Sequence, residues 1–169
     1  MTGVTLRPYQ RDAIANVIAA RRAGVKRMVV SLPTGSGKTV IFSELARLAR
    51  RPVLVIAHRR ELVQQARDKV ARALGDASVV AVEQGVTTAH DGAHVVVASI
   101  RSLSDERLAR VVSARRFGLV VYDECHHATA EDNRLSPAGT IRVHSVISAK
   151  LPRKASPSRV DMPSATETR

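Results

Sequence analysis

The chain has 169 residues, of which 44% are hydrophobic, and a formal net charge of +12. This length suits one α/β domain, and no apolar run approaches the ~20 residues needed to span a bilayer. The first ten residues lack a signal-peptide core, and Cys125, the single cysteine, excludes an intramolecular disulfide, so we expect a cytoplasmic protein. The charge favours a polyanionic partner, nucleic acid first, although a solvated basic surface explains it equally well.

Apolar periodicity predicts helices and strands that alternate along the chain. In order, these are helix 7–23, strand 27–32, helix 40–50, strand 53–57, helix 61–74, strands 79–82 and 95–98, helix 105–115 and strand 119–122. Ser104 is the expected N-cap of the last helix, with acidic residues in its first turn. The alternation predicts an α/β fold, a parallel, doubly wound sheet with helices on both faces.

The composition changes at Arg134, after which the chain is rich in Ser, Pro, Arg and Thr. Residues 140–148 are a candidate strand, and residues 149–169 are predicted to be disordered. We therefore expect a domain over residues 1–133 and an atypical tail over residues 134–169, which we interpret as a truncated or out-of-frame end. If neither other reading frame past codon 133 restores an apolar strand ending in Thr-Ala-Thr, the frameshift explanation is wrong.

A phosphate-binding loop is predicted at residues 32–39, Leu-Pro-Thr-Gly-Ser-Gly-Lys-Thr, between a strand and a helix. Backbone N–H groups and the helix dipole favour an anion there, Lys38 adds a cation, and the Thr39 hydroxyl can ligate Mg²⁺. The general pattern has Gly where this chain has Leu32, a strand-end position that does not touch phosphate. The predicted cofactor-binding residues of the loop are Thr34, Gly35, Ser36, Gly37, Lys38 and Thr39.

An acidic pair, Asp123 and Glu124, follows the last predicted strand of the domain. Asp123 can hold Mg²⁺ through water, and Glu124 can orient or deprotonate the water that attacks the γ-phosphate. A zinc site at residues 125–127 is disfavoured, because adjacent residues leaving a strand point to opposite sides and no second Cys is available.

Five segments resemble, in order, the first RecA-like domain of a superfamily 2 DExH helicase, closest to the type III restriction enzyme Res-subunit class, over roughly residues 4–133. They are residues 6–10, 32–39, 57–65, 97–103 and 123–127. The resemblance implies that Gln10 hydrogen-bonds the adenine edge, with Arg7 or Tyr9 near the base. It implies ATP and Mg²⁺ as cofactors and catalytic roles for Lys38, Asp123, Glu124 and His126, with Thr39 and Asp123 at the metal.

The same resemblance implies a nucleic-acid interface formed by His58, Arg59, Arg60, Ser99 and Arg101. Physical reasoning agrees, because a strand turns into a helix near residue 58 and offers free N–H groups and arginines to a phosphate. The alternative is an ordinary helix N-terminus with solvated arginines.

The implied function is that of an ATP-dependent helicase or translocase domain that hydrolyses ATP on nucleic acid, with DNA favoured over RNA. A larger motor or restriction/repair complex is the expected assembly, and no membrane is involved. We expect little unwinding by this chain alone, because the family's second RecA-like domain is missing. A nucleotide-gated binding module or inactive remnant stays open as an alternative, and a P-loop kinase or transporter ATPase fits less well.

The family's next strand carries a Ser/Thr-Ala-Thr motif and lies between the strands that precede the phosphate loop and the acidic pair. Residues 164–166 read Ser-Ala-Thr but follow no apolar strand, so we treat that match as chance. Residues 140–148 are the candidate to fill the central position in the sheet.

Overall fold

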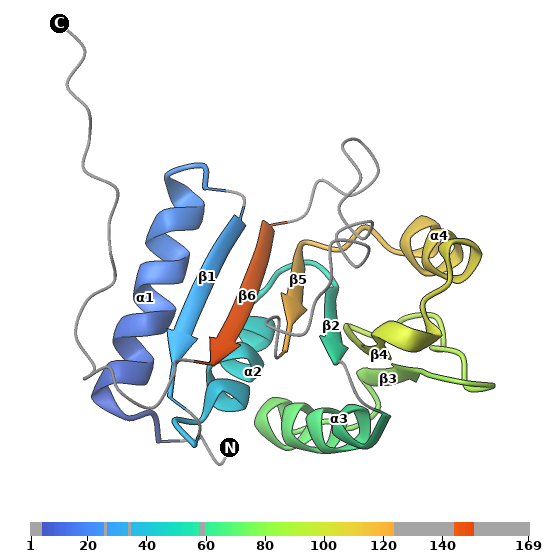
Figure 1. The fold of residues 1–169 in the computed structure, drawn as a ribbon, viewed down its shortest axis with the longest axis horizontal. Coiled ribbons are helices and arrows are strands. Elements are labelled where there is room, and N and C mark those ends of the chain that lie inside the picture. Colours follow the sequence, from blue (N-terminus) through green and yellow to red (C-terminus); the bar gives the residue numbers. More distant parts are fainter. Residues whose placement is uncertain (1–4, 26, 34, 58–59, 124–143, 151–169) are drawn as a thin grey trace, which may run out of the picture.

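The computed structural model describes residues 5–25, 27–33, 35–57, 60–123 and 144–150, with Arg60 and residues 144–150 described for their backbone alone. The elements are α1 (Pro8–Arg22), β1 (Arg27–Leu32), α2 (Lys38–Leu48), β2 (Val53–Ala57), α3 (Arg60–Leu74), β3 (Val80–Glu83), β4 (Val95–Ser99), η1 (Ile100–Ser102), α4 (Asp105–Ala114), β5 (Leu119–Tyr122) and β6 (His144–Lys150). Every helix and strand expected before residue 123 is present, and α2 begins two residues earlier than predicted (Figure 1).

The strands form one parallel sheet in the order β1-β6-β5-β2-β4-β3. This confirms the doubly wound α/β prediction. Because all strands run the same way, the carboxyl ends of β1, β5, β2 and β4 meet at one edge of the sheet, where such folds bind ligands.

Strand β6 occupies the central position that the family resemblance requires. It pairs with β1 on one side, where Met28 faces Val146, and with β5 on the other, where Val146 faces Val121. The predicted strand over residues 140–148 therefore exists but runs from His144 to Lys150. The prediction of disorder was wrong for residues 149–150, because pairing with Ser31 and Leu32 satisfies backbone groups that composition does not reveal. Residues 151–169 lie outside the described part of the chain, and the boundary at residue 133 stays a prediction.

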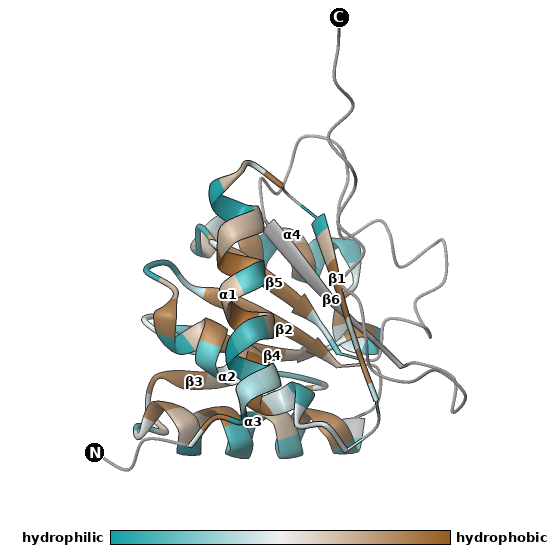
Figure 2. Cartoon of the chain, turned by 90° about the vertical axis from the view of Figure 1, so that its left-hand side faces the viewer, coloured by the Kyte–Doolittle hydropathy of each residue, from teal (hydrophilic) through white to brown (hydrophobic). Residues whose placement is uncertain are grey.

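Helices cover both faces of the sheet (Figures 1 and 2). On β2, Val53 and Val55 belong to the hydrophobic cluster shared with α1, α2 and α3, whereas Leu54 and Ile56 belong to the cluster on the α4 side. A strand buried on both faces must be apolar without interruption, which explains the run at residues 53–57. No helix among the described residues has the length and hydropathy needed to cross a membrane.

Candidate functional site

The phosphate loop joins the end of β1 to the first turn of α2. Gly35 has φ +80° and Gly37 has φ +78°, a left-handed conformation that residues with a Cβ rarely adopt. Gly37 is the N-cap of α2, and its carbonyl accepts a hydrogen bond from the Val40 N–H at 2.9 Å. Leu32 is the last residue of β1, so the position where the general pattern has Gly belongs to the strand, as expected.

The segment Arg7–Gln10, at the start of α1, is hydrogen-bonded to this loop. Tyr9 Oη donates to the Ser36 carbonyl at 2.7 Å, and Gln10 Nε2 donates to the same oxygen at 3.0 Å. The Arg7 N–H in turn donates to Gln10 Oε1 at 2.9 Å, and only 5% of Gln10 is exposed. The structure therefore joins the first two segments of the family pattern, and the contact of Gln10 with adenine stays a prediction.

The loop residues fit a triphosphate. Lys38 and Thr39 are half-buried in the first turn of α2, beside backbone N–H groups that no helical carbonyl can accept from. Ser36 Oγ is buried without a hydrogen-bond partner among the described residues, and a phosphate oxygen would satisfy it. Thr34 lies outside the described residues.

Asp123 lies at the same sheet edge, directly after β5. Its N–H donates to the Ile56 carbonyl at 2.9 Å, which fixes its backbone to β2, and the residue is half-buried. Strand β6 separates β5 from β1, so Asp123 lies two strand spacings from the phosphate loop, about 10 Å across the sheet. Thr39 and Asp123, the two residues predicted to hold Mg²⁺, therefore follow β1 and β5, the two strands that flank β6.

The remaining residues of the acidic motif, Glu124 and His126 among them, lie outside the described residues. Within the part of the chain that is described, no three His, Cys, Asp or Glu side chains gather as a metal site would require.

The predicted nucleic-acid residues follow β2 and β4, which are neighbours in the sheet. Ala57 and Ser99 end these strands and face each other in the register. Ser99 is fully buried, and its Oγ has no hydrogen-bond partner within the described segments, whereas Arg101 in η1 is exposed. His58 and Arg59 lie outside the described residues, and Arg60 is the first residue of α3. The residues predicted to bind nucleotide thus follow β1 and β5, and the segments predicted to bind nucleic acid follow β2 and β4.

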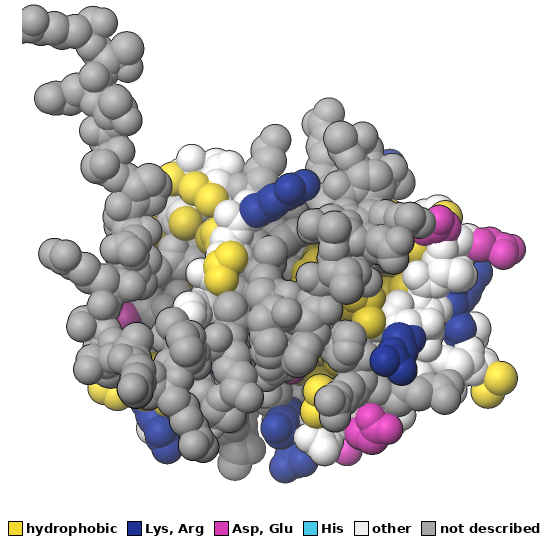
Figure 3. Space-filling view, viewed as in Figure 1, with side chains coloured by type: hydrophobic (Ala, Val, Ile, Leu, Met, Phe, Trp, Pro, Cys, Tyr) yellow, Lys and Arg dark blue, Asp and Glu magenta, His cyan; other side chains and the backbone are white. Residues whose placement is uncertain are grey.

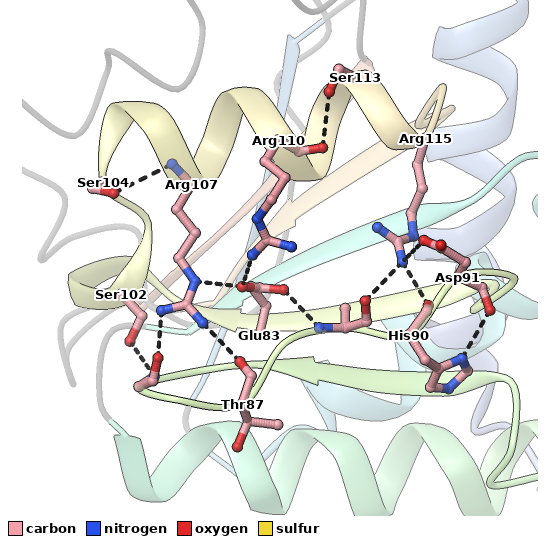
Figure 4. Close-up of polar contacts among 12 residues, drawn as sticks. Glu83, Thr87, His90, Asp91, Ser102, Ser104, Arg107, Arg110, Ser113 and Arg115 are labelled. Atoms are coloured by element: carbon pink, nitrogen blue, oxygen red, sulfur yellow. Dashed lines mark hydrogen bonds and ion pairs between the residues drawn. The ribbon is translucent and has the colours of Figure 1, made fainter.

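Sequence reasoning missed Glu83, the last residue of β3. This carboxylate has no exposed surface, yet it pairs with Arg107 and Arg110 of α4 and accepts the Ala89 N–H at 2.7 Å (Figure 4). Burial alone would raise the pKa of Glu83, but the Ala89 N–H and the arginines outweigh it and hold the pKa below its usual range. Two features of the sequence could have indicated this cluster. Glu83 is a charged residue at the end of an apolar strand, and Arg107 and Arg110 lie three residues apart on a later helix.

Arg107 also reaches beyond the carboxylate. Its Nη1 donates to the Gly85 carbonyl at 2.5 Å and its Nη2 to the Thr87 carbonyl at 2.8 Å. The Gly85 N–H donates to Ser102 Oγ at 3.2 Å, so the network extends from β3 through the turn at residues 84–87 to η1.

Comparisons with known proteins agree with this geometry. The model of the family described as type III restriction enzyme, res subunit, matches residues 3–152. The chain is 38% identical over 128 residues to the "Putative mitochondrial ATP-dependent helicase irc3" of Schizosaccharomyces pombe, covering 72% of this chain and 21% of that protein. It is 36% identical over 140 residues to the "Putative ATP-dependent helicase IRC3" of Saccharomyces cerevisiae, covering 76% of this chain and 20% of that protein.

Among solved structures, the crystal structure of the UvsW helicase from bacteriophage T4 is similar, with a TM-score of 0.69 over 86% of this chain and 52% of that chain. The sequence identity of 22% makes this a likeness of fold. The chain spans about a fifth of the length of the two curated relatives.

Proposed function

This chain belongs to the family described as type III restriction enzyme, res subunit, as a helicase-type domain, and we propose that it binds and hydrolyses ATP while holding a nucleic-acid strand. The observation that carries the proposal is the meeting of two motifs at one sheet edge. The phosphate loop opens α2, and Asp123 stands two strands along, with β6 between them. Nucleotide and metal sites of parallel sheets lie at this edge.

In the proposed site, the N–H groups at the start of α2 and the Lys38 ammonium hold the β- and γ-phosphates of ATP. Thr39 and Asp123 would hold Mg²⁺, whose positive charge would offset the charge that develops on the phosphates. Glu124 orients or deprotonates the attacking water, and His126 belongs to the same catalytic group. Phosphoryl transfer depends mainly on positioning and electrostatic stabilisation, which these groups supply.

The strand ends of β2 and β4 form the proposed nucleic-acid interface. Residues 58–60 and 99–101 leave neighbouring strands, so their N–H groups and arginines can bind successive phosphates of one strand. Such contacts are indifferent to base sequence. DNA is the proposed substrate, and a larger motor or restriction/repair complex the proposed assembly. Weak strand separation by this chain alone is part of the same proposal.

The test is binding of a fluorescent ATP analogue to the full chain. Lys38→Ala is expected to weaken binding by about tenfold or more, because it removes the cation at the phosphates. Lys69→Ala makes the same change at an exposed position of α3 and is expected to bind as the unaltered chain does. Equal affinities for all three proteins would refute the proposed nucleotide site.

Phosphate release with and without DNA separates the enzyme from its alternative. DNA-stimulated release that disappears in Lys38→Ala and Glu124→Gln supports an ATP hydrolase. Salt-sensitive DNA binding without any phosphate release supports a nucleotide-gated binding module instead.

A further inference from the structure

We propose that Glu83 and Arg107 are positioning residues, which hold the segment Ser99–Ser102 in the geometry that a nucleic-acid strand requires. The inference rests on the proposed function and assigns a role to a buried carboxylate that the nucleotide site does not use. Neither residue belongs to the five segments of the family pattern.

The first step is the fixed position of Arg107. Glu83 has no exposed surface, and a buried carboxylate is tolerated only when donors surround it. Three donors do so here: Arg107, Arg110 at 2.7 Å and the Ala89 N–H at 2.7 Å. Any movement of Arg107 away from Glu83 would leave charge poorly paired inside the protein, so the carboxylate fixes the guanidinium.

The second step leads from Arg107 to the turn after β3. Gln84 and Thr87 close this turn with reciprocal backbone hydrogen bonds of 3.0 and 2.8 Å. The Arg107 guanidinium donates to two carbonyls of the turn, at Gly85 and Thr87, while its Nε faces Glu83 (Figure 4). A planar guanidinium can do this because its donors diverge in fixed directions, which a lysine ammonium cannot reproduce.

The third step leads from the turn to η1. The Gly85 N–H donates to Ser102 Oγ at 3.2 Å, and the Arg107 N–H donates to Ser104 Oγ, the N-cap of α4, at 3.3 Å. Ser99, at the other end of the segment, is held in the sheet opposite Ala57. The segment 99–102 is therefore restrained by β4 before it and, at Ser102, by the turn that the Arg107 side chain holds in place.

Arg101 is exposed within this restrained segment. A phosphate contact gains affinity when the backbone that carries it is already in the bound geometry, because less order must be imposed on binding. Loosening the restraint should therefore weaken nucleic-acid binding and leave the proposed nucleotide site unaffected, because its strands β5, β6 and β1 lie two, three and four places from β4 in the sheet.

The test compares Arg107→Lys with Arg110→Lys in the full chain. Both replacements keep a positive charge near Glu83, but only the first removes the bonds to Gly85 and Thr87. We expect Arg107→Lys, which loses both of these bonds, to weaken binding of a fluorescent oligo-thymidylate by about three- to tenfold, and Arg110→Lys to leave it unchanged. Affinity for the ATP analogue should be the same in both variants.

Ser102→Ala provides a second variant that removes only the far end of the network. Like Arg107→Lys, it should weaken binding of the oligo-thymidylate, and it should leave the midpoint of thermal unfolding unchanged.

If the unaltered chain binds the oligonucleotide and both Arg107→Lys and Ser102→Ala bind it equally well, the positioning inference is overturned and the proposed function stands. Loss of ATP-analogue affinity together with oligonucleotide affinity would also overturn it, because that pattern indicates general unfolding. If the unaltered chain binds no oligonucleotide, both the inference and the proposed nucleic-acid role fail.

Discussion

Gly37 illustrates how one residue of the phosphate loop meets two separate demands. Its φ of +78° lies in the left-handed region, and a Cβ built there would stand 2.6 Å from Gln10 Nε2. The left-handed conformation could be anticipated, because a glycine precedes Lys38 in the motif. The close approach of Gln10 could not be anticipated, because nothing in the local sequence indicates that residue 10 packs against residue 37.

The two demands can be separated by matched substitutions. Gly35→Ala introduces only the left-handed strain, since nothing lies within 4 Å of its Cβ position, and should lower the free energy of unfolding by about 1–2 kcal/mol. Gly37→Ala adds the overlap with Gln10 and should lower the free energy of unfolding by more than Gly35→Ala does. Urea denaturation measures both losses, and equal values would mean that Gln10 moves aside freely.

At the scale of elements, helix ends and strands with strong local signals agree with expectation. Ser104 caps α4 as predicted, accepting the Arg107 N–H at 3.3 Å, with Asp105 and Glu106 in the first turn. Strands β1, β2 and β5 begin and end at the predicted residues. Strand β6 differs, because its bounds follow from pairing with β1 and β5 rather than from its own residues.

Truncation tests the importance of β6. A chain ending at residue 143 would leave β1 and β5 without the neighbour that pairs with both, so buried backbone groups would lose their partners. We expect this chain to lack a cooperative unfolding transition by circular dichroism. A chain ending at Lys150 keeps β6 and lacks only the residues after it. Comparing the two shortened chains therefore separates the effect of losing β6 from the effect of losing the later residues. An unaltered transition in the shorter chain would disprove the central role of β6.

At the scale of the whole molecule, the chain has a net charge of +12. Its sheet edge carries two proposed sites, one for nucleotide at β1 and β5 and one for nucleic acid at β2 and β4. Among the described residues visible in Figure 3, Lys and Arg side chains stand in several separate groups rather than in one continuous patch. Net charge therefore attracts a polyanion from a distance, whereas the strand ends of β2 and β4 are the proposed place of contact.

Salt dependence tests whether Arg101 makes such a contact. Affinity for oligo-thymidylate should fall as salt rises, and Arg101→Ala should reduce the slope of the logarithmic plot by about one, because one fewer counterion is released. Arg22→Ala removes the same charge from the end of α1, at the opposite edge of the sheet, and should leave the slope nearly unchanged. Identical slopes for both variants would indicate a diffuse attraction with no contact at Arg101.

The amino-acid sequence by itself determined the alternation of helices and strands, the phosphate loop at residues 32–39 and the strand end before Asp123. These features depend on periodicity, glycine conformation and helix capping, which are interactions between residues close in the chain. The tertiary structure alone decided the bounds of β6, the docking of Gln10 on Ser36 and the burial of Glu83 beneath Arg107. Each of these joins residues at least 24 positions apart, so its free energy exists only after the sheet has formed.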